Sequence, residues 1–141
     1  MATKYHKIKG QIKWAKNVIE PDDFRGSSNY KVNLYNVDEA AWKSSGVQTR
    51  PKQDRDGDMV YVLKRPVKKI IRGEIVEFGP PEFVMSDGSP VTKMVGNGSN
   101  VEVEYVTYDT SMGVGHRFNK VIVHNLVEYA PPENNSNEAF S

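Results

Sequence analysis

The feature that most constrains the fold is a strand pattern between Met94 and Tyr129. Asn97-Gly98 is a pair of residues that tolerates positive φ, and the run from Val101 to Tyr105 after it alternates apolar and acidic side chains. The return segment, Phe118 to Tyr129, is apolar at both parities, which predicts a central strand covered on both sides or bent by a bulge. The glycines within Asp109 to His116 predict a mobile loop tip that can touch a ligand. We therefore expect a β-hairpin that closes a small barrel.

The length of 141 residues fits one domain, and a chain of this size buries roughly 70% of its unfolded surface. The chain has no cysteine, which excludes disulfides, thiolate metal sites and cysteine nucleophiles and agrees with a reducing compartment. Its uncharged apolar runs are far shorter than the ~20 residues of a membrane span, and the N-terminus lacks a signal-peptide pattern. We expect a soluble, unprocessed, cytoplasmic protein with no membrane partner.

The net charge of +1 conceals a charge asymmetry along the chain. Residues 1–72 contain 16 Lys and Arg against 8 Asp and Glu, whereas residues 73–141 contain 3 against 10. A basic half joined to an acidic half is found in nucleic-acid-binding proteins, although solvated strands with opposite charge bias give the same count. Charge alone leaves both interpretations open.

Two early segments predict strands with a polar outer face. The first is Lys7–Lys16, in which Trp14 shares the parity of the isoleucines, and the second is Tyr30–Val37. Paired in register, they present one surface of amines, amides and a ring, which suits a polyanion with stackable bases. The residues of that predicted surface are Lys9, Gln11, Lys13, Lys31, Asn33 and Tyr35.

The remaining segments complete an all-β pattern. Asp38 is placed to cap a short helix over residues 39–45, with Trp42 turned to the core, and a polar loop over residues 48–58 precedes a strand over residues 59–65. A basic segment over residues 67–72 and a short strand over residues 83–85 follow. Without a βαβ rhythm, this order predicts an OB-fold-like, five-stranded antiparallel barrel with one short helix, an extra hairpin and loops. We expect this domain to cover residues 1–129 and a disordered tail to cover residues 130–141.

Motifs for enzymatic chemistry are weak. The segment Asp54–Asp58 resembles the start of a calcium loop, but its glycine comes two residues early and Arg65 stands where the bidentate glutamate should be. The three histidines are scattered, and the glycines and serines lack a nucleotide-binding or hydrolase context. We expect no catalytic residue, metal or cofactor. The enzymatic alternative is a metal-dependent nuclease that would use Asp56, Asp58, Glu102 or Glu104.

Residues 7–129 as a whole resemble phage-encoded single-stranded DNA-binding proteins with an OB fold. The resemblance rests on the order and spacing of short motifs, not on any one of them: Gly10, Lys13-Trp14-Ala15, Tyr30-Lys31-Val32-Asn33-Leu34, Asp38-Glu39, Lys64-Arg65-Pro66, Gly79-Pro80-Pro81, Asp87-Gly88, Gly96-Asn97-Gly98-Ser99 and Leu126-Val127-Glu128-Tyr129.

This resemblance implies sequence-tolerant binding to single strands during phage replication, recombination or repair, in the host cytoplasm, without a cofactor or turnover. Relatives often end in a strongly acidic tail with an aromatic residue that recruits replication or recombination proteins. Here the tail has only Glu133 and Glu138 before Phe140. Recruitment through Phe140 is a hypothesis that this departure weakens.

A binding site of this kind needs cations along the phosphates and rings on which bases stack. The predicted phosphate contacts are Lys13, Lys16, Lys31, Lys64, Arg65, Lys69, Arg72 and Arg117. The predicted stacking rings are Tyr35 and Tyr61, which we place on outer faces, together with Trp14 and Tyr108, for which packing in the core is the competing interpretation.

The main alternative function is a phage structural or adaptor β-barrel that acts in protein–protein interaction through its opposite charge poles. The sequence leaves open whether the chain is a monomer or a homo-oligomer. It also leaves open the choice between DNA and RNA, because stacking and phosphate contacts do not read the 2′-hydroxyl.

Overall fold

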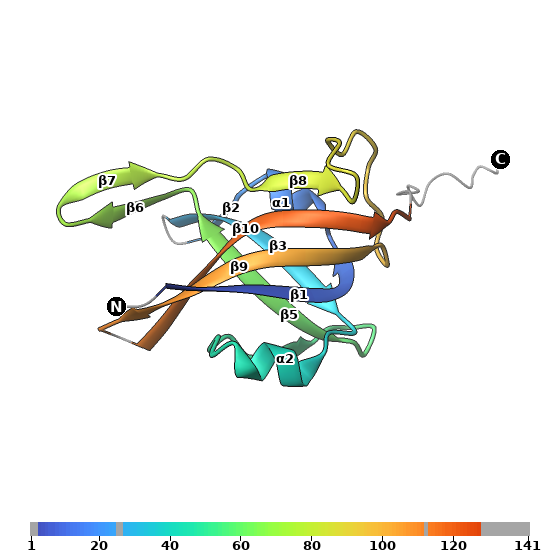
Figure 1. The fold of residues 1–141 in the computed structure, drawn as a ribbon, viewed down its shortest axis with the longest axis horizontal. Helices are drawn as coiled ribbons and strands as arrows, with labels where there is room; N and C mark the ends of the chain where they lie inside the picture. The colour runs from blue at the N-terminus through green and yellow to red at the C-terminus, as the bar shows by residue number, and fades with distance from the viewer. Residues whose placement is uncertain (1–2, 25–26, 112, 128–141) are drawn as a thin grey trace.

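The long strands of the chain form one strongly twisted sheet in the computed structural model, which describes residues 3–24, 27–111 and 113–127 (Figure 1). In spatial order the five long strands are β5 (Met59–Pro66), β3 (Ser27–Tyr35), β1 (Thr3–Lys13), β9 (Asn100–Thr110) and β10 (Gly113–Asn125). Each pairs antiparallel with its neighbour. The short strands are β2 (Asp22–Phe24) beside β3, β4 (Lys52–Gln53) beside β5 and β8 (Glu82–Met85) beside β10. The predicted OB-like, all-β fold is confirmed.

The two ends of this five-stranded order approach each other without a backbone ladder in the described part of the chain. Side chains bridge the two strands instead. One is His116 on β10, whose Nε2 accepts from the backbone N–H of Lys64 on β5 at 3.0 Å, and another is Arg65 on β5. A partly open barrel of this kind is typical of OB folds.

The apolar side chains that alternate along the strands fill the barrel interior. Ile12, Val32, Leu34, Leu63 and Phe118 are each 0% exposed and come from β1, β3, β5 and β10. Burial of side chains of this size stabilises the fold by about 1.5–3 kcal/mol each. This core fixes which side of each strand faces solvent, and therefore which polar residues are available for binding.

The β9–β10 hairpin agrees with the predicted strands but not with the predicted loop. Gly98 has φ +96° before β9, and β10 has a register shift between Phe118 and Lys120, as its mixed parity indicated. The expected mobile loop over residues 109–116 is wrong, because most of it is strand, with Gly115 opposite Tyr108. A Cβ at Gly115 would lie 2.5 Å from the Tyr108 ring, so this glycine provides room for a ring and does not serve a loop tip.

The described residues contain two short helices, of which the sequence predicted one. Helix α2 (Glu39–Ser44) begins as predicted, because Asp38 accepts hydrogen bonds from the N–H groups of Ala40 and Ala41, and Trp42 is buried in the core. The unpredicted helix is α1 (Lys16–Ile19), a single turn after β1. The strand that the sequence predicted to reach Lys16 ends at Lys13 instead, because Trp14 has φ +53° and the chain then turns into α1, which buries Val18.

A two-stranded hairpin made of β6 (Lys68–Ile71) and β7 (Glu74–Glu77) projects from the barrel (Figure 1). Its turn has Arg72 at φ +53° and Gly73 at φ +80°, the pattern of a tight hairpin turn. Arg72 is therefore at the tip of the hairpin, between β6 and β7.

The predicted domain boundary at residue 129 and the predicted tail with Phe140 lie outside the described residues. In the described part, no helix is long and apolar enough to cross a membrane.

Candidate nucleic-acid interface

Four predicted cations gather where β5, β10 and the base of the β6–β7 hairpin meet. We call them, with the two rings that three of them contact, the cationic ridge. Its members are Lys64, Arg65, Lys69, Arg117, Phe78 and Tyr108.

Arg65 is the fixed element of the ridge. Its Nε donates to the carbonyl oxygen of Gly79 at 2.8 Å, and its Nη1 donates to Asn119 Oδ1 at 2.8 Å and to the carbonyl oxygen of Phe118 at 3.3 Å. Burial and the nearby charge of Arg117 lower the pKa of Arg65, although a guanidinium stays charged in proteins. Because its acceptors are neutral, Arg65 adds a full positive charge to this surface.

Phe78 joins the two arginines of the ridge. The guanidinium carbons of Arg65 and Arg117 lie 5.6 and 4.9 Å from its ring centroid, and Arg117 Nε donates to Asn119 Oδ1 at 3.1 Å. Both distances fit a cation–π contact. Phe78 was not among the predicted rings, because it follows β7 as a lone aromatic residue outside any alternating run. Its position one residue before Gly79-Pro80-Pro81 was the available signal.

Tyr108 is the second ring of the ridge. Its ring packs against Gly115. The ammonium of Lys69 lies 5.1 Å from the centroid of the ring and 3.4 Å from its hydroxyl oxygen. A flexible lysine can leave a ring that a base then covers. The arrangement therefore permits an exchange in which a base stacks on Tyr108 and Lys69 moves to a phosphate.

Lys64 extends the ridge toward β3. Its side chain is exposed, and in the β3–β5 register it stands opposite Lys31, whose Nζ pairs with Asp22 Oδ2 at 2.9 Å. The imidazole of His116, which holds the Lys64 backbone, is neutral at pH 7, because burial and the charge of Lys64 lower its pKa to about 4. The scaffold under this cation is therefore uncharged.

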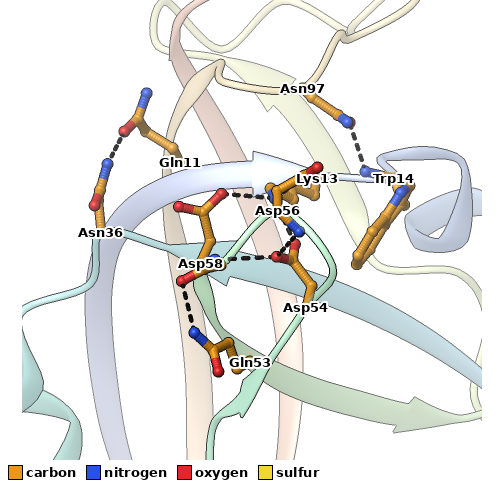
Figure 2. Close-up of polar contacts among 10 residues, drawn as sticks. Gln11, Lys13, Trp14, Asn36, Gln53, Asp54, Asp56, Asp58 and Asn97 are labelled. Atoms are coloured by element: carbon orange, nitrogen blue, oxygen red, sulfur yellow. Dashed lines mark hydrogen bonds and ion pairs between the residues drawn. The ribbon is translucent and has the colours of Figure 1, made fainter.

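The strand pattern predicted an exposed Lys13 on the outer face, and the structure instead shows its ammonium covered. Figure 2 shows its ammonium surrounded by three carboxylates, with distances of 2.5 Å to Asp54, 3.4 Å to Asp56 and 2.8 Å to Asp58. The hydrogen bond to Asp54 is the main cause that raises the pKa of Lys13, and the same bond lowers the pKa of Asp54. Lys13 is only 4% exposed because the turn that holds these aspartates folds over the end of β1.

Two aspartates of this turn, Asp56 and Asp58, are among the four carboxylates that the nuclease alternative would use. Oxygens of Asp54, Asp56 and Asp58 lie within 4.8 Å of one another, a spacing that could hold a cation. The ammonium of Lys13 already occupies that place. Of the other two predicted carboxylates, Glu102 pairs with His124 at 3.1 Å and Glu104 with Lys7 at 3.9 Å.

Tyr35 is half-buried on the same outer face as Lys13, with the Lys13 ammonium 4.9 Å from its ring centroid. Tyr61, by contrast, is not on an outer face. It is 6% exposed and packs edge-on against Trp42, with ring centroids 5.0 Å apart. Apolar residues occur at both parities of β5, so the sequence pattern assigned Tyr61 to the wrong face. Both Val60 and Tyr61 are buried.

Trp14 and Lys16 form a separate region. Trp14 has φ +53°, and its backbone N–H donates to Asn97 Oδ1 at 2.9 Å. Trp14 is 45% exposed, so it does not follow the isoleucines of β1 into the core. It borders a mostly apolar groove of about 1140 Å³ beside α1, which Lys16 and Met94 also line. Lys16 pairs with Glu20 at 3.7 Å. This region and the tip residue Arg72 are not part of the ridge.

No family model matches this sequence, and no curated protein matches it. Solved structures do. gp2.5, a single-stranded DNA binding protein encoded by bacteriophage T7, has a TM-score of 0.59 and 17% sequence identity, covering 97% of this chain and 94% of that chain. The single-stranded DNA-binding protein from bacteriophage Enc34, solved in complex with ssDNA, has a TM-score of 0.52 and 12% identity, covering 89% of each chain. The chain therefore has the fold of these phage single-stranded DNA-binding proteins.

Proposed function

We propose that this protein binds single-stranded DNA without sequence preference, through the cationic ridge. The observation that supports this most directly is that Arg65, Arg117 and Lys69, whose partners are neutral, contact two rings on an OB-like barrel, with Lys64 beside them on β5. Phosphates supply the charge that this surface lacks, and bases supply flat faces for the rings. The similar fold of the two phage proteins agrees with the proposal.

Each group of the ridge has a distinct task in this proposal. Lys64, Lys69 and Arg117 contact phosphates, while Arg65 positions the neighbouring backbone and Phe78 through its three hydrogen bonds. Tyr108 stacks a base once Lys69 moves away, and such a stack contributes about 1–3 kcal/mol. None of these steps makes or breaks a covalent bond, so the protein acts as a binder without turnover. Protection of exposed single strands during phage replication, recombination or repair is the role that follows.

The test is fluorescence anisotropy with labelled oligothymidine, oligouridine and a double-stranded DNA, titrated over a range of salt concentrations. We expect a strong preference for single strands and a logarithmic affinity that falls by about 0.7 per phosphate contact per unit of log salt. Equal affinity for double strands, or binding that ignores salt, would contradict the proposal. The oligouridine titration decides between DNA and RNA.

A further inference from the structure

The outer face formed by β1, β3 and β5 has a polar centre that the cationic ridge does not use. In the strand registers Lys13 stands opposite Asn33, Asn33 stands opposite Val62, and Tyr35 stands opposite Gln11. We call Lys13, Asn33 and Tyr35 the covered site. The Lys13 ammonium lies 4.9 Å from the centroid of the Tyr35 ring, and Asn33 is the register neighbour of Lys13 on β3. An ammonium, an amide and an aromatic ring are the groups that bind a phosphate and its base in proteins that recognise single strands.

Aspartate carboxylates already occupy the position at the covered site that a phosphate would take. The Lys13 ammonium is bound by three carboxylates, so the local charge of one cation and three anions is negative. Carboxylates and phosphates accept the same charge-assisted hydrogen bonds from ammonium groups. In the free state the immediate surroundings of Lys13 therefore disfavour a phosphate, although the strands of this face are rich in lysine.

The contacts that hold the turn on Lys13 differ in how easily they can be exchanged. Asp54 belongs to the fold of the turn: its side chain is 11% exposed, and its Oδ1 accepts from the N–H groups of Asp56 and Asp58. The side chains of Asp56 and Asp58 are 71% and 40% exposed. Solvent and ions reach these two carboxylates, so a phosphate can replace them while Asp54 keeps the turn intact.

Asn33 provides an independent sign of an absent partner. The residue is 6% exposed, and its Nδ2 has no hydrogen-bond acceptor among the described residues. A buried donor left without an acceptor is costly, and such groups in folded proteins call for an explanation. A phosphate oxygen or a base carbonyl next to Lys13 would supply the acceptor.

We propose that Lys13, Asn33 and Tyr35 form a second subsite for a phosphate and base of single-stranded DNA, and that the Asp54–Asp58 turn occupies it in the free protein as an internal phosphate mimic. This inference rests on the proposed function and adds its regulation. A bound strand displaces Asp56 and Asp58, its phosphate takes their place on Lys13, and a base replaces the ammonium over Tyr35. The turn thereby sets a threshold that short or weakly bound strands do not pass.

The test compares the full chain with Asp56→Asn/Asp58→Asn, using oligothymidine anisotropy at several salt concentrations. Because the mimic loses its charge, we expect affinity to rise by about fivefold and the salt slope to steepen by about 0.7, the value for one additional phosphate contact. Adding Lys13→Gln to that variant should return the slope to that of the unmodified chain. Thermal melting followed by circular dichroism confirms that each variant is folded, and Asp56→Asn alone is the fallback if the double variant unfolds.

A matched control removes the same charge elsewhere. Glu39→Gln/Glu82→Gln neutralises two exposed carboxylates on α2 and β8. If this control raises affinity as much as the turn variant, the effect is one of net charge and the mimic is refuted. A salt slope that stays unchanged in the turn variant, or that ignores Lys13→Gln, refutes the subsite.

The two proposals fail in distinguishable ways. If neither the unmodified chain nor the turn variant binds oligothymidine, the proposed function is wrong. If the unmodified chain binds, ridge substitutions weaken it and turn substitutions change nothing, only the inference about the covered site is wrong.

Discussion

The cationic ridge and the covered site both contain lysines that the sequence placed in one binding surface, yet their surroundings give them opposite electrostatic character. On the ridge, Arg65 and Arg117 are held by carbonyl oxygens, an amide and a ring, which leave their charge uncompensated. At the covered site, Lys13 is held by three carboxylates. The partners of a cation, and not its presence on a strand face, therefore decide whether it attracts a phosphate.

The largest effect should come from removing the uncompensated charges of the ridge. In Lys64→Gln/Lys69→Gln/Arg117→Gln we expect oligothymidine affinity to fall by about 100-fold at low salt and the salt slope to flatten by about 2, for three lost phosphate contacts. The measurement is anisotropy across a salt series.

The control for this variant is Lys4→Gln/Lys43→Gln/Lys52→Gln, which removes three exposed lysines outside the ridge and outside the predicted strand surface. It should lose much less affinity, because general attraction declines but no contact is lost. Equal losses in the two triple variants would remove the distinction between the ridge and other lysines.

A second effect separates the two regions by their response to pH. Burial lowers the pKa of His116 to about 4, against 6.5 in an unfolded chain, so the unfolded state binds more protons between these values. Stability from this group is fully present above pH 6.5 and is lost as the pH falls toward 4. At the covered site, the bond from Lys13 lowers the pKa of Asp54, so that contribution is lost only below the ordinary carboxyl range.

We therefore expect the free energy of unfolding to fall by about 1–2 kcal/mol between pH 7 and pH 5, measured by urea titration. In His116→Gln most of this decrease should disappear, because the titrating group is gone. An undiminished decrease in that variant would assign the pH dependence to other groups.

The smallest effect concerns the ring on the ridge. In Gly115→Ala the new methyl group would lie 2.5 Å from the Tyr108 ring, so the ring must move and its stacking should be impaired. We expect affinity to fall by about fivefold, within the range for a weakened base stack. Gly79→Ala is the matched control, because a Cβ there meets nothing within 4 Å. Similar losses in both variants would show that Tyr108 does not stack.

Much of the candidate site could be predicted from residue types, but its grouping could not. Lys64, Arg65, Lys69, Arg117 and Tyr108 were all predicted, and they do lie together. Phe78 was missed because it stands outside every alternating run, and Tyr61 was misplaced because β5 is apolar at both parities. The predicted phosphate contacts and stacking rings do not all lie open on one surface, since Lys13 is covered and Tyr61 is in the core.

The sequence by itself determined the strands, because side-chain alternation is a local property that the two faces of a sheet impose directly. The Asn97-Gly98 pair and the Asp38 cap determined, in the same local way, the turn before β9 and the start of helix α2. Only the tertiary structure decided which cations remain uncompensated. That outcome depends on contacts between residues far apart in the chain, such as Lys13 with Asp54 and Lys64 with His116, and electrostatic energy depends on distance in space and not on separation along the chain.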